Sequence, residues 1–161
     1  MGQKISQSVL KTWCENFPMV KFSYPSKQTL KNFIEVIVEG NYSIRRYLPH
    51  IDDEWHQIIN DCIAYVVSTS AYTGDTTIYQ ESANLIYKIA KRHELGDGNK
   101  RSAVIATYCF CLINGYWIND PQKLKRQAKR IASTRGRQNE EMMKRRVASS
   151  LERIIIINST N

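Results

Sequence analysis

The sequence lacks an apolar run long enough to cross a membrane, which takes about 18 residues or more. Lys4 is the only charge in the first ten residues, and no long apolar segment follows it, so we expect no secretory signal. The cysteines at 109 and 111 share one apolar stretch, and no second cysteine or histidine pair completes a metal site. Repeats and low-complexity linkers are absent too. We therefore expect a cytoplasmic protein with no membrane partner, whose cysteines are reduced and packed in the core.

Apolar residues recur at helical spacing over most of the 161 residues, and a chain of this length favours one domain. Hydrophobic residues make up 42% of the chain, which is enough for one real core. The pattern predicts an all-α fold, a single compact domain of about six helices over residues 26–161, with residues 1–25 as an N-terminal extension. The apolar spacing marks these helices at about residues 30–38, 55–67, 85–90, 103–113, 121–131 and 140–154.

Residues that begin and end helices support these boundaries. The expected N-caps are Ser26, Asp52 or Asp53, Asp120 before Pro121, and Asn139, while Asn114-Gly115 ends the central helix. We expect residues 154–157, a run of four isoleucines, to form the last helical turn of the core. The convincing extended piece is residues 71–79, which could form a short β-hairpin around Thr73-Gly74-Asp75; the alternative is an ordinary loop.

The segment His93–Ser102, HELGDGNKRS, has the layout of a phosphate site at the start of a helix. Gly98 is expected to let the backbone turn tightly. The first N–H groups of the following helix lack intrahelical partners, and the helix dipole adds partial positive charge. Lys100 and Arg101 add two full positive charges. The pattern therefore predicts an anion-binding turn.

An acid and a histidine complete this segment. Asp97 is an acidic residue in an otherwise cationic turn. Mg²⁺ takes oxygen ligands, usually one or two carboxylates together with phosphates, so we expect Asp97 to hold this ion. His93 can take up a proton near neutral pH without special tuning. A base, a metal carboxylate and an anion site together predict transfer of a phosphorus group to a hydroxyl.

These residues resemble the Fic/Doc signature, roughly H-x-[FL]-x-[DE]-[GA]-N-[GK]-R. The stretch Asp97–Ala103 is similar to the pattern D-[GA]-N-K-R-[TS]-A of the Doc (death-on-curing) toxin branch. Leu95 stands where phenylalanine is commoner. Val104 stands where adenylyl-transferring Fic proteins carry a second arginine, which Doc-type proteins also lack. The resemblance spans about residues 27–155.

The resemblance implies a protein Ser/Thr kinase that transfers the γ-phosphoryl group of ATP, with Mg²⁺, and blocks translation. The expected target is elongation factor Tu, and a small antitoxin is expected to inhibit the toxin in trans. His93 would accept the hydroxyl proton, Asp97 would hold Mg²⁺, and Arg101 would stabilise the transition state. The implied nucleotide and phosphate contacts are Gly98, Asn99, Lys100, Arg101 and Ser102. A flap beside the motif would hold the target segment as an added strand, and the predicted hairpin supplies Tyr72, Thr73, Gly74, Asp75 and Thr76 for it.

Two other functions stay open. A Fic-type adenylyl (nucleotidyl) transferase is the alternative, although Lys100 and Val104 argue against it. The third is a nonenzymatic nucleic-acid-binding protein. The net charge is +8, and residues 120–146 hold ten Lys and Arg against three acids. This region, Lys123–Arg146, could bind nucleic acid, but no aromatic-basic stripe accompanies it, so this function is not favoured.

The two other histidines have no evident role in the sequence. Neither His50 nor His56 is accompanied by the third ligand or the acid cluster that a metal site needs. We expect His56 to lie at the surface of the helix that begins near Asp52.

Overall fold

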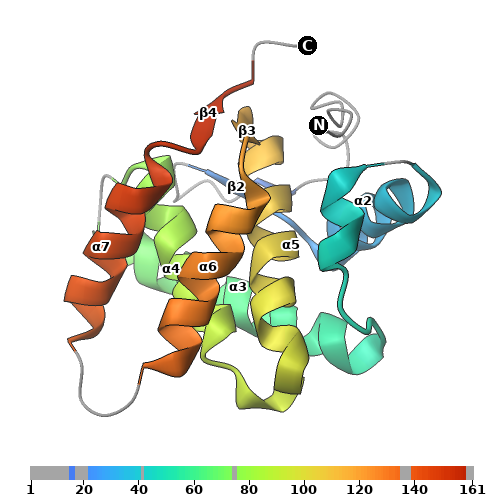
Figure 1. Ribbon diagram of the computed structural model, residues 1–161, viewed down its shortest axis with the longest axis horizontal. Coiled ribbons are helices and arrows are strands. Elements are labelled where there is room, and N and C mark those ends of the chain that lie inside the picture. Colours follow the sequence, from blue (N-terminus) through green and yellow to red (C-terminus); the bar gives the residue numbers. More distant parts are fainter. Residues whose placement is uncertain (1–14, 17–21, 41, 74–75, 135–138, 159–161) are drawn as a thin grey trace.

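The structure is a computed structural model that describes residues 15–16, 22–40, 42–73, 76–134 and 139–158. Within these ranges six α-helices dominate, which confirms the expected all-α domain (Figure 1). The α-helices are α2 Lys27–Glu39, α3 Asp53–Thr73, α4 Ile78–Ala90, α5 Asn99–Ile113, α6 Pro121–Ser133 and α7 Glu140–Leu151. Two short 3-10 helices, η1 Ser43–Tyr47 and η2 His93–Gly98, precede α3 and α5.

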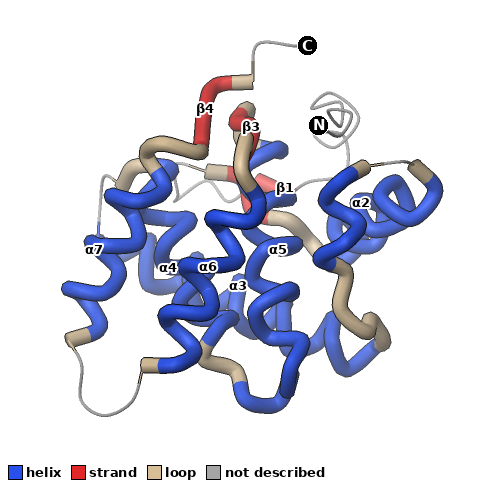
Figure 2. Tube along the Cα trace, viewed as in Figure 1, coloured by secondary structure: helices blue, strands red, loops and turns tan. Residues whose placement is uncertain are grey.

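Helix α5 is the centre of the fold. Every residue from Ser102 to Ile113 is buried, as the nearly continuous apolar sequence requires. Helices α4 and α6 contact α5 most extensively, α2 and η1 also touch it, and α7 packs on α4. The start of α5, which carries the motif, lies at the end of the molecule away from the short strands (Figure 2).

The predicted N-caps set the helix boundaries. In each case a side-chain oxygen accepts a hydrogen bond from a backbone N–H: Ser26 from Thr29, Asp52 from Trp55, Asp120 from Lys123, and Asn139 from Glu141 and Met142. Gly115 has a φ of 88°, so the chain turns after α5 at a residue that adopts this conformation without strain.

The strands form two short antiparallel pairs, β1 Glu15–Asn16 with β2 Ser23–Tyr24, and β3 Tyr116–Ile118 with β4 Ile155–Ile157. The expected helical turn at residues 154–157 is therefore wrong. Ile155–Ile157 pair with β3, with Trp117 opposite Ile156, because β-branched residues after the end of α7 suit a strand beside an existing edge.

The prediction of a hairpin at residues 71–79 is also wrong. Backbone residues 71–73 continue α3, and Tyr79 lies in α4. Thr77 is the N-cap of α4, where its hydroxyl accepts from the Gln80 N–H while the Gln80 side chain accepts from the Thr77 N–H. This capping box starts a helix where the threonines suggested a strand. Gly74 and Asp75 lie outside the described residues.

The packed domain begins before residue 26. Tyr24 is fully buried against Phe110, with ring centroids 5.2 Å apart. The Ser23 N–H donates to Asn114 Oδ1, and Asn114 Nδ2 donates to the Ser23 carbonyl, both over 2.8 Å. Residues 22–25 therefore belong to the domain and not to an extension.

The described cysteines are free and buried, at positions 62, 109 and 111, as expected of core residues. Burial raises the pKa of the Cys62 thiol to about 11 and that of Cys111 to about 12. Within the described ranges, no helix combines the length and the apolar character that a membrane span requires.

Candidate active site at the start of helix α5

The motif occupies the junction between α4 and α5. The 3-10 helix η2 covers its first six residues, and α5 begins at Asn99. The Asn99 side chain is buried, and its Nδ2 donates over 2.8 Å to the carbonyl of Ala90, the last residue of α4. Asn99 therefore joins the end of α4 to the start of α5 and fixes the loop between them. The amide that was expected to reach a phosphate makes this internal bond.

The tight turn lies at Gly96 and not at Gly98. Gly96 has φ 54° and ψ −131°, a conformation that only glycine adopts easily. Gly98 has φ −80° and ψ −8°, which any residue adopts. A Cβ on Gly98 would meet the Pro49 Cβ at 3.4 Å, an ordinary contact. The expectation that Gly98 makes the turn is thus wrong, although Gly98 does lie at the helix start.

Helix α5 begins without a side-chain cap, because its N-cap residue is Gly98. Its first N–H groups therefore keep the partial positive charge that favours an anion. Arg101 is exposed and Lys100 is partly exposed in the first turn. These features agree with the anion site that the sequence predicts for this turn.

Ser102 serves the fold. Its side chain is fully buried, and its hydroxyl donates to the Gly98 carbonyl over 2.6 Å. The same oxygen accepts a hydrogen bond of 2.8 Å from Trp55 Nε1 on α3. Because both bonds are internal, the structure does not place Ser102 in contact with a ligand, contrary to the phosphate role implied by the resemblance.

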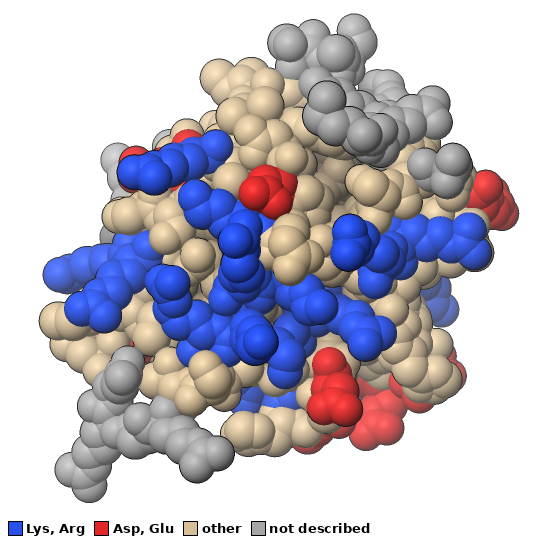
Figure 3. Space-filling model, in the orientation of Figure 1, with Lys and Arg blue, Asp and Glu red and all other residues tan. Residues whose placement is uncertain are grey.

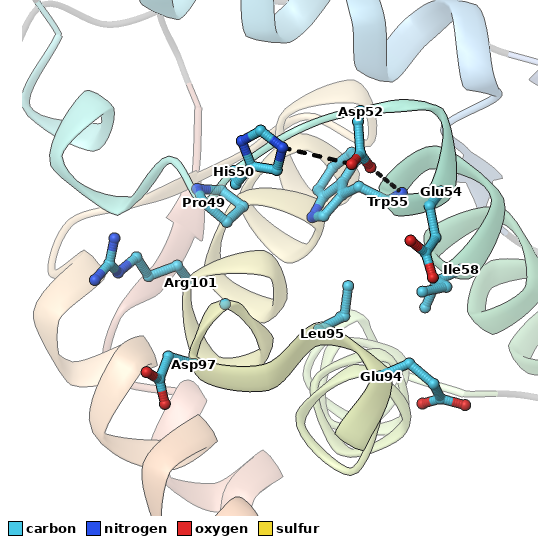
Figure 4. A pocket seen from close by; sticks show the side chains of 11 residues that line it. Pro49, His50, Asp52, Glu54, Trp55, Ile58, Glu94, Leu95, Asp97 and Arg101 are labelled. Atoms are coloured by element: carbon cyan, nitrogen blue, oxygen red, sulfur yellow. Dashed lines mark hydrogen bonds and ion pairs between the residues drawn. The ribbon is translucent and has the colours of Figure 1, made fainter.

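A cavity of about 340 Å³ lies against the start of α5 (Figure 4). The motif contributes Asp97, Gly98 and Arg101 to its wall, together with Glu94 and Leu95. The opposite wall comes from the segment before α3 and its first turns: Pro49, His50, Asp52, Glu54, Trp55 and Ile58. Figure 4 shows Leu95 between the two walls, with Asp97 and Arg101 on the motif side. Three of the predicted site residues therefore share one cavity.

The cavity wall is more acidic than the sequence suggested. It carries the carboxylates of Asp52, Glu54, Glu94 and Asp97 against a single guanidinium, that of Arg101. Hydrogen bonding to its own backbone N–H, with help from Arg92, lowers the pKa of the Glu94 carboxyl and keeps it ionised. Such a wall favours a cation over a bare phosphate chain. A polyphosphate is better accommodated on the Lys100 side of the helix start, outside the cavity.

Asp97 is available to a metal ion. Its side chain is exposed, and it takes part in no salt bridge within the described part of the chain. Among the same residues, no group of three or more His, Cys, Asp or Glu side chains could hold a metal by itself. Asp97 thus fits the Mg²⁺ arrangement in which one carboxylate acts together with phosphate oxygens.

The structure does not place His93 on the cavity wall. His93 is the first residue of η2 and is exposed, so its imidazole is accessible from solvent near the motif. The histidine on the wall is His50, whose Nε2 lies 3.5 Å from Asp52 Oδ2 (Figure 4). Sequence reasoning missed His50 and Asp52 because they lie some forty residues from the motif and only the fold brings them to it.

The predicted flap is far from this site. Helix α3 begins beside the motif, where Trp55 contacts Ser102, and its 21 residues span about 30 Å before it ends at Thr73. The backbone of Tyr72 and Thr73 is helical at that far end, and Thr76 donates to Glu81 over 3.3 Å. The described residues of the predicted flap, Tyr72, Thr73 and Thr76, therefore lie too far from the motif to hold a target segment before it. The segment beside the motif is residues 49–52.

His56 is buried, with 5% of its surface exposed, so its expected surface position is wrong. Its ring packs edge-on against Trp55, 5.0 Å between centroids, and its Nδ1 has no hydrogen-bond partner in the described structure. Burial, and then Lys31 and Lys27, lower the pKa of His56.

Comparison of the chain with protein-family models, with curated proteins and with solved structures finds no match.

Proposed function

We propose that the protein transfers the γ-phosphoryl group of ATP to a Ser or Thr hydroxyl of a target protein, as toxins of the Doc branch do. The observation that carries this proposal is the meeting of Asp97, Gly98 and Arg101 at one cavity, beside the uncapped start of α5. An acid, a guanidinium and a helix N-terminus at one point suit a reaction that depends on positioning and charge neutralisation.

The phosphates would lie over the first turn of α5. Lys100 offers a point charge, and Arg101 offers a planar group that can hold two phosphate oxygens as negative charge develops in the transition state. The acidic wall of the cavity would disfavour a triphosphate inside it, which supports a position over the first turn of α5. Mg²⁺, when bound to Asp97, neutralises charge on the phosphate oxygens.

The transfer itself forms one bond and breaks one. The hydroxyl oxygen of the target bonds to the γ-phosphorus, and the bond from that phosphorus to the bridging oxygen breaks, so ADP leaves. His93 takes the hydroxyl proton. Its exposed place at the start of η2 leaves it accessible to a segment of another protein. We take elongation factor Tu as the target, the cytoplasm as the place of reaction, and a small antitoxin acting in trans as the inhibitor.

The test compares wild-type protein with the His93→Ala variant, using Mg²⁺, γ-labelled ATP and purified elongation factor Tu. We expect wild type to label Ser or Thr of the factor. Loss of the general base should slow labelling by about 10²–10⁴-fold. Nucleotide affinity, measured by calorimetry, should stay near the wild-type value because the cations of α5 remain. Labelling by His93→Ala at the wild-type rate would remove His93 from this role.

A further inference from the structure

Helix α6 presents an outward side that is rich in cations. Its apolar residues Leu124, Ala128 and Ile131 are buried, whereas its five Lys and Arg are not: Arg126, Lys129 and Arg130 are exposed, and Lys123 and Lys125 are partly exposed. No acid occurs between Pro121 and Ser133. The N-cap residue Asp120 precedes the helix, and its Oδ2 lies 3.8 Å from the Arg126 guanidinium.

The 3-10 helix η1, distant in sequence, adds to this charge. The Tyr47 hydroxyl donates to Gln122 Oε1 over 2.8 Å, which fixes η1 against the start of α6. The Arg46 guanidinium lies 5.5 Å from the centre of the Tyr47 ring, and Lys125 Nζ lies 5.9 Å from the same centre. Arg46 and Lys125 therefore stand beside one aromatic ring, and the neighbouring Arg45 is exposed as well.

The motif lies at the border of the same surface. Helix α5 contacts both η1 and α6, and its first turn carries Lys100 and Arg101. Figure 3 shows Lys and Arg side chains gathered across α6 and on either side of it, with few acids among them. We call this surface the cationic face and define it by eight residues: Arg45, Arg46, Lys100, Arg101, Lys125, Arg126, Lys129 and Arg130.

The cationic face has no apolar anchor. The exposed large hydrophobic residues of the described chain lie on other elements: Val38, Tyr65, Met142, Ile156 and Ile157. A protein interface draws its affinity from buried apolar and aromatic anchors, and single-stranded nucleic acid binds by stacking on aromatic rings. A duplex needs neither, because cations alone can contact the phosphates of its backbone.

We propose that the protein binds the phosphate backbone of duplex nucleic acid through the cationic face, without sequence specificity. This binding shares Lys100 and Arg101 with the proposed phosphoryl-transfer site but uses a wider surface, most of which lies outside that site. With several phosphates neutralised, the dissociation constant should be about 10⁻⁶–10⁻⁴ M at physiological salt. The logarithm of the association constant should also fall steeply with the logarithm of salt concentration, with a slope steeper than about −4.

The test measures fluorescence anisotropy of short labelled DNA and RNA duplexes over a range of salt. The variant carries Arg126→Gln, Lys129→Gln and Arg130→Gln, which keep helix propensity and lie outside the motif. We expect at least about tenfold weaker binding and a slope flatter by about 2 to 3, as the loss of three phosphate contacts predicts. The DNA and RNA arms show whether one duplex is preferred.

The matched control carries Lys27→Gln, Lys31→Gln and Arg153→Gln, which remove the same charge from outside the cationic face. This control should bind like wild type. Equal weakening in both variants would overturn the proposal, because only net charge would then matter. Wild-type binding to polyglutamate but not to duplex would overturn it in favour of an acidic protein partner. A wild-type salt slope shallower than about −2 would overturn it without any variant.

Discussion

Gly96 is the residue on which the backbone of the motif depends most. Its φ of 54° and ψ of −131° place it where a side chain is strained. Gly98, two residues later, has an ordinary helical conformation and room for a methyl group beside Pro49. The two glycines therefore offer a matched pair of substitutions within one turn.

We expect Gly96→Ala to lower the free energy of unfolding by about 1–3 kcal/mol. Gly98→Ala should change the free energy of unfolding by less than about 1 kcal/mol, because alanine can adopt the native conformation of this residue and also restricts the unfolded chain. Urea unfolding of both variants checks this difference. Greater damage from Gly98→Ala would show that the turn of the motif lies where the sequence alone had placed it.

The sequence identified the motif but misassigned individual residues in it. Asp97 and Arg101 line one cavity. Ser102, however, is buried, and its hydroxyl makes internal hydrogen bonds. Gly98 is not the strained glycine. A linear pattern gives the order of side chains, but it does not show which of them turn inward, because that depends on how α3 packs against α5.

Between elements, the bond from Trp55 to Ser102 ties α3 to the start of α5. Ser102→Ala would leave the buried Trp55 N–H without its acceptor. We expect a loss of about 1–3 kcal/mol in the free energy of unfolding, with ATP affinity of the folded protein unchanged. Ser149→Ala on the exposed side of α7 is the control, with a change within about 0.5 kcal/mol.

Calorimetric titration of ATP into both folded serine variants completes this comparison. Weaker ATP binding by Ser102→Ala at wild-type stability would reverse the assignment and return Ser102 to phosphate binding.

The helices were predictable because capping side chains and apolar spacing agreed. Asp120 and Pro121 begin α6, and Asn139 caps α7, as the sequence indicated. Prediction failed where β-branched residues stand next to helix ends. Thr77 starts α4 instead of a strand, and Ile155–Ile157 form β4 instead of a helical turn. Local propensity was overridden in the first case by a capping box and in the second by an available strand edge.

At the scale of the whole molecule, distant segments meet in ways that the sequence could not show. Side chains from Pro49 to Ile58 form one wall of the cavity, and η1 joins α6 in the cationic face. No local pattern marks either segment as functional. Their positions follow from the packing of α3 and η1 around α5, which is a property of the complete fold.

Stability should fall with acidification because of His56. Burial and two lysines hold the folded-state pKa of His56 below its ordinary 6.5. Below pH 6.5 the unfolded chain therefore binds a proton that the folded chain does not, and unfolding is favoured. The contribution of neutral His56 to the free energy of unfolding is complete above pH 6.5 and is lost as the pH falls towards the folded-state pKa.

Urea unfolding of His56→Gln from pH 8 to pH 5 tests this linkage. The variant should lose less stability over this range than wild type does, whereas the exposed His50→Gln should follow wild type. Parallel curves for His56→Gln and wild type would show that His56 does not control the response.

The central claim is that the start of α5 positions ATP for attack at its γ-phosphorus. The most direct measurement incubates the purified protein with Mg²⁺ and bacterial lysate in two parallel reactions, one with γ-labelled and one with α-labelled ATP. Lys100 stands where adenylyl transferases have glycine, and Val104 stands where they have a second arginine. We expect label on Ser or Thr of a protein from the γ position alone. Label from the α position alone would contradict phosphoryl transfer and indicate nucleotidyl transfer at the same site.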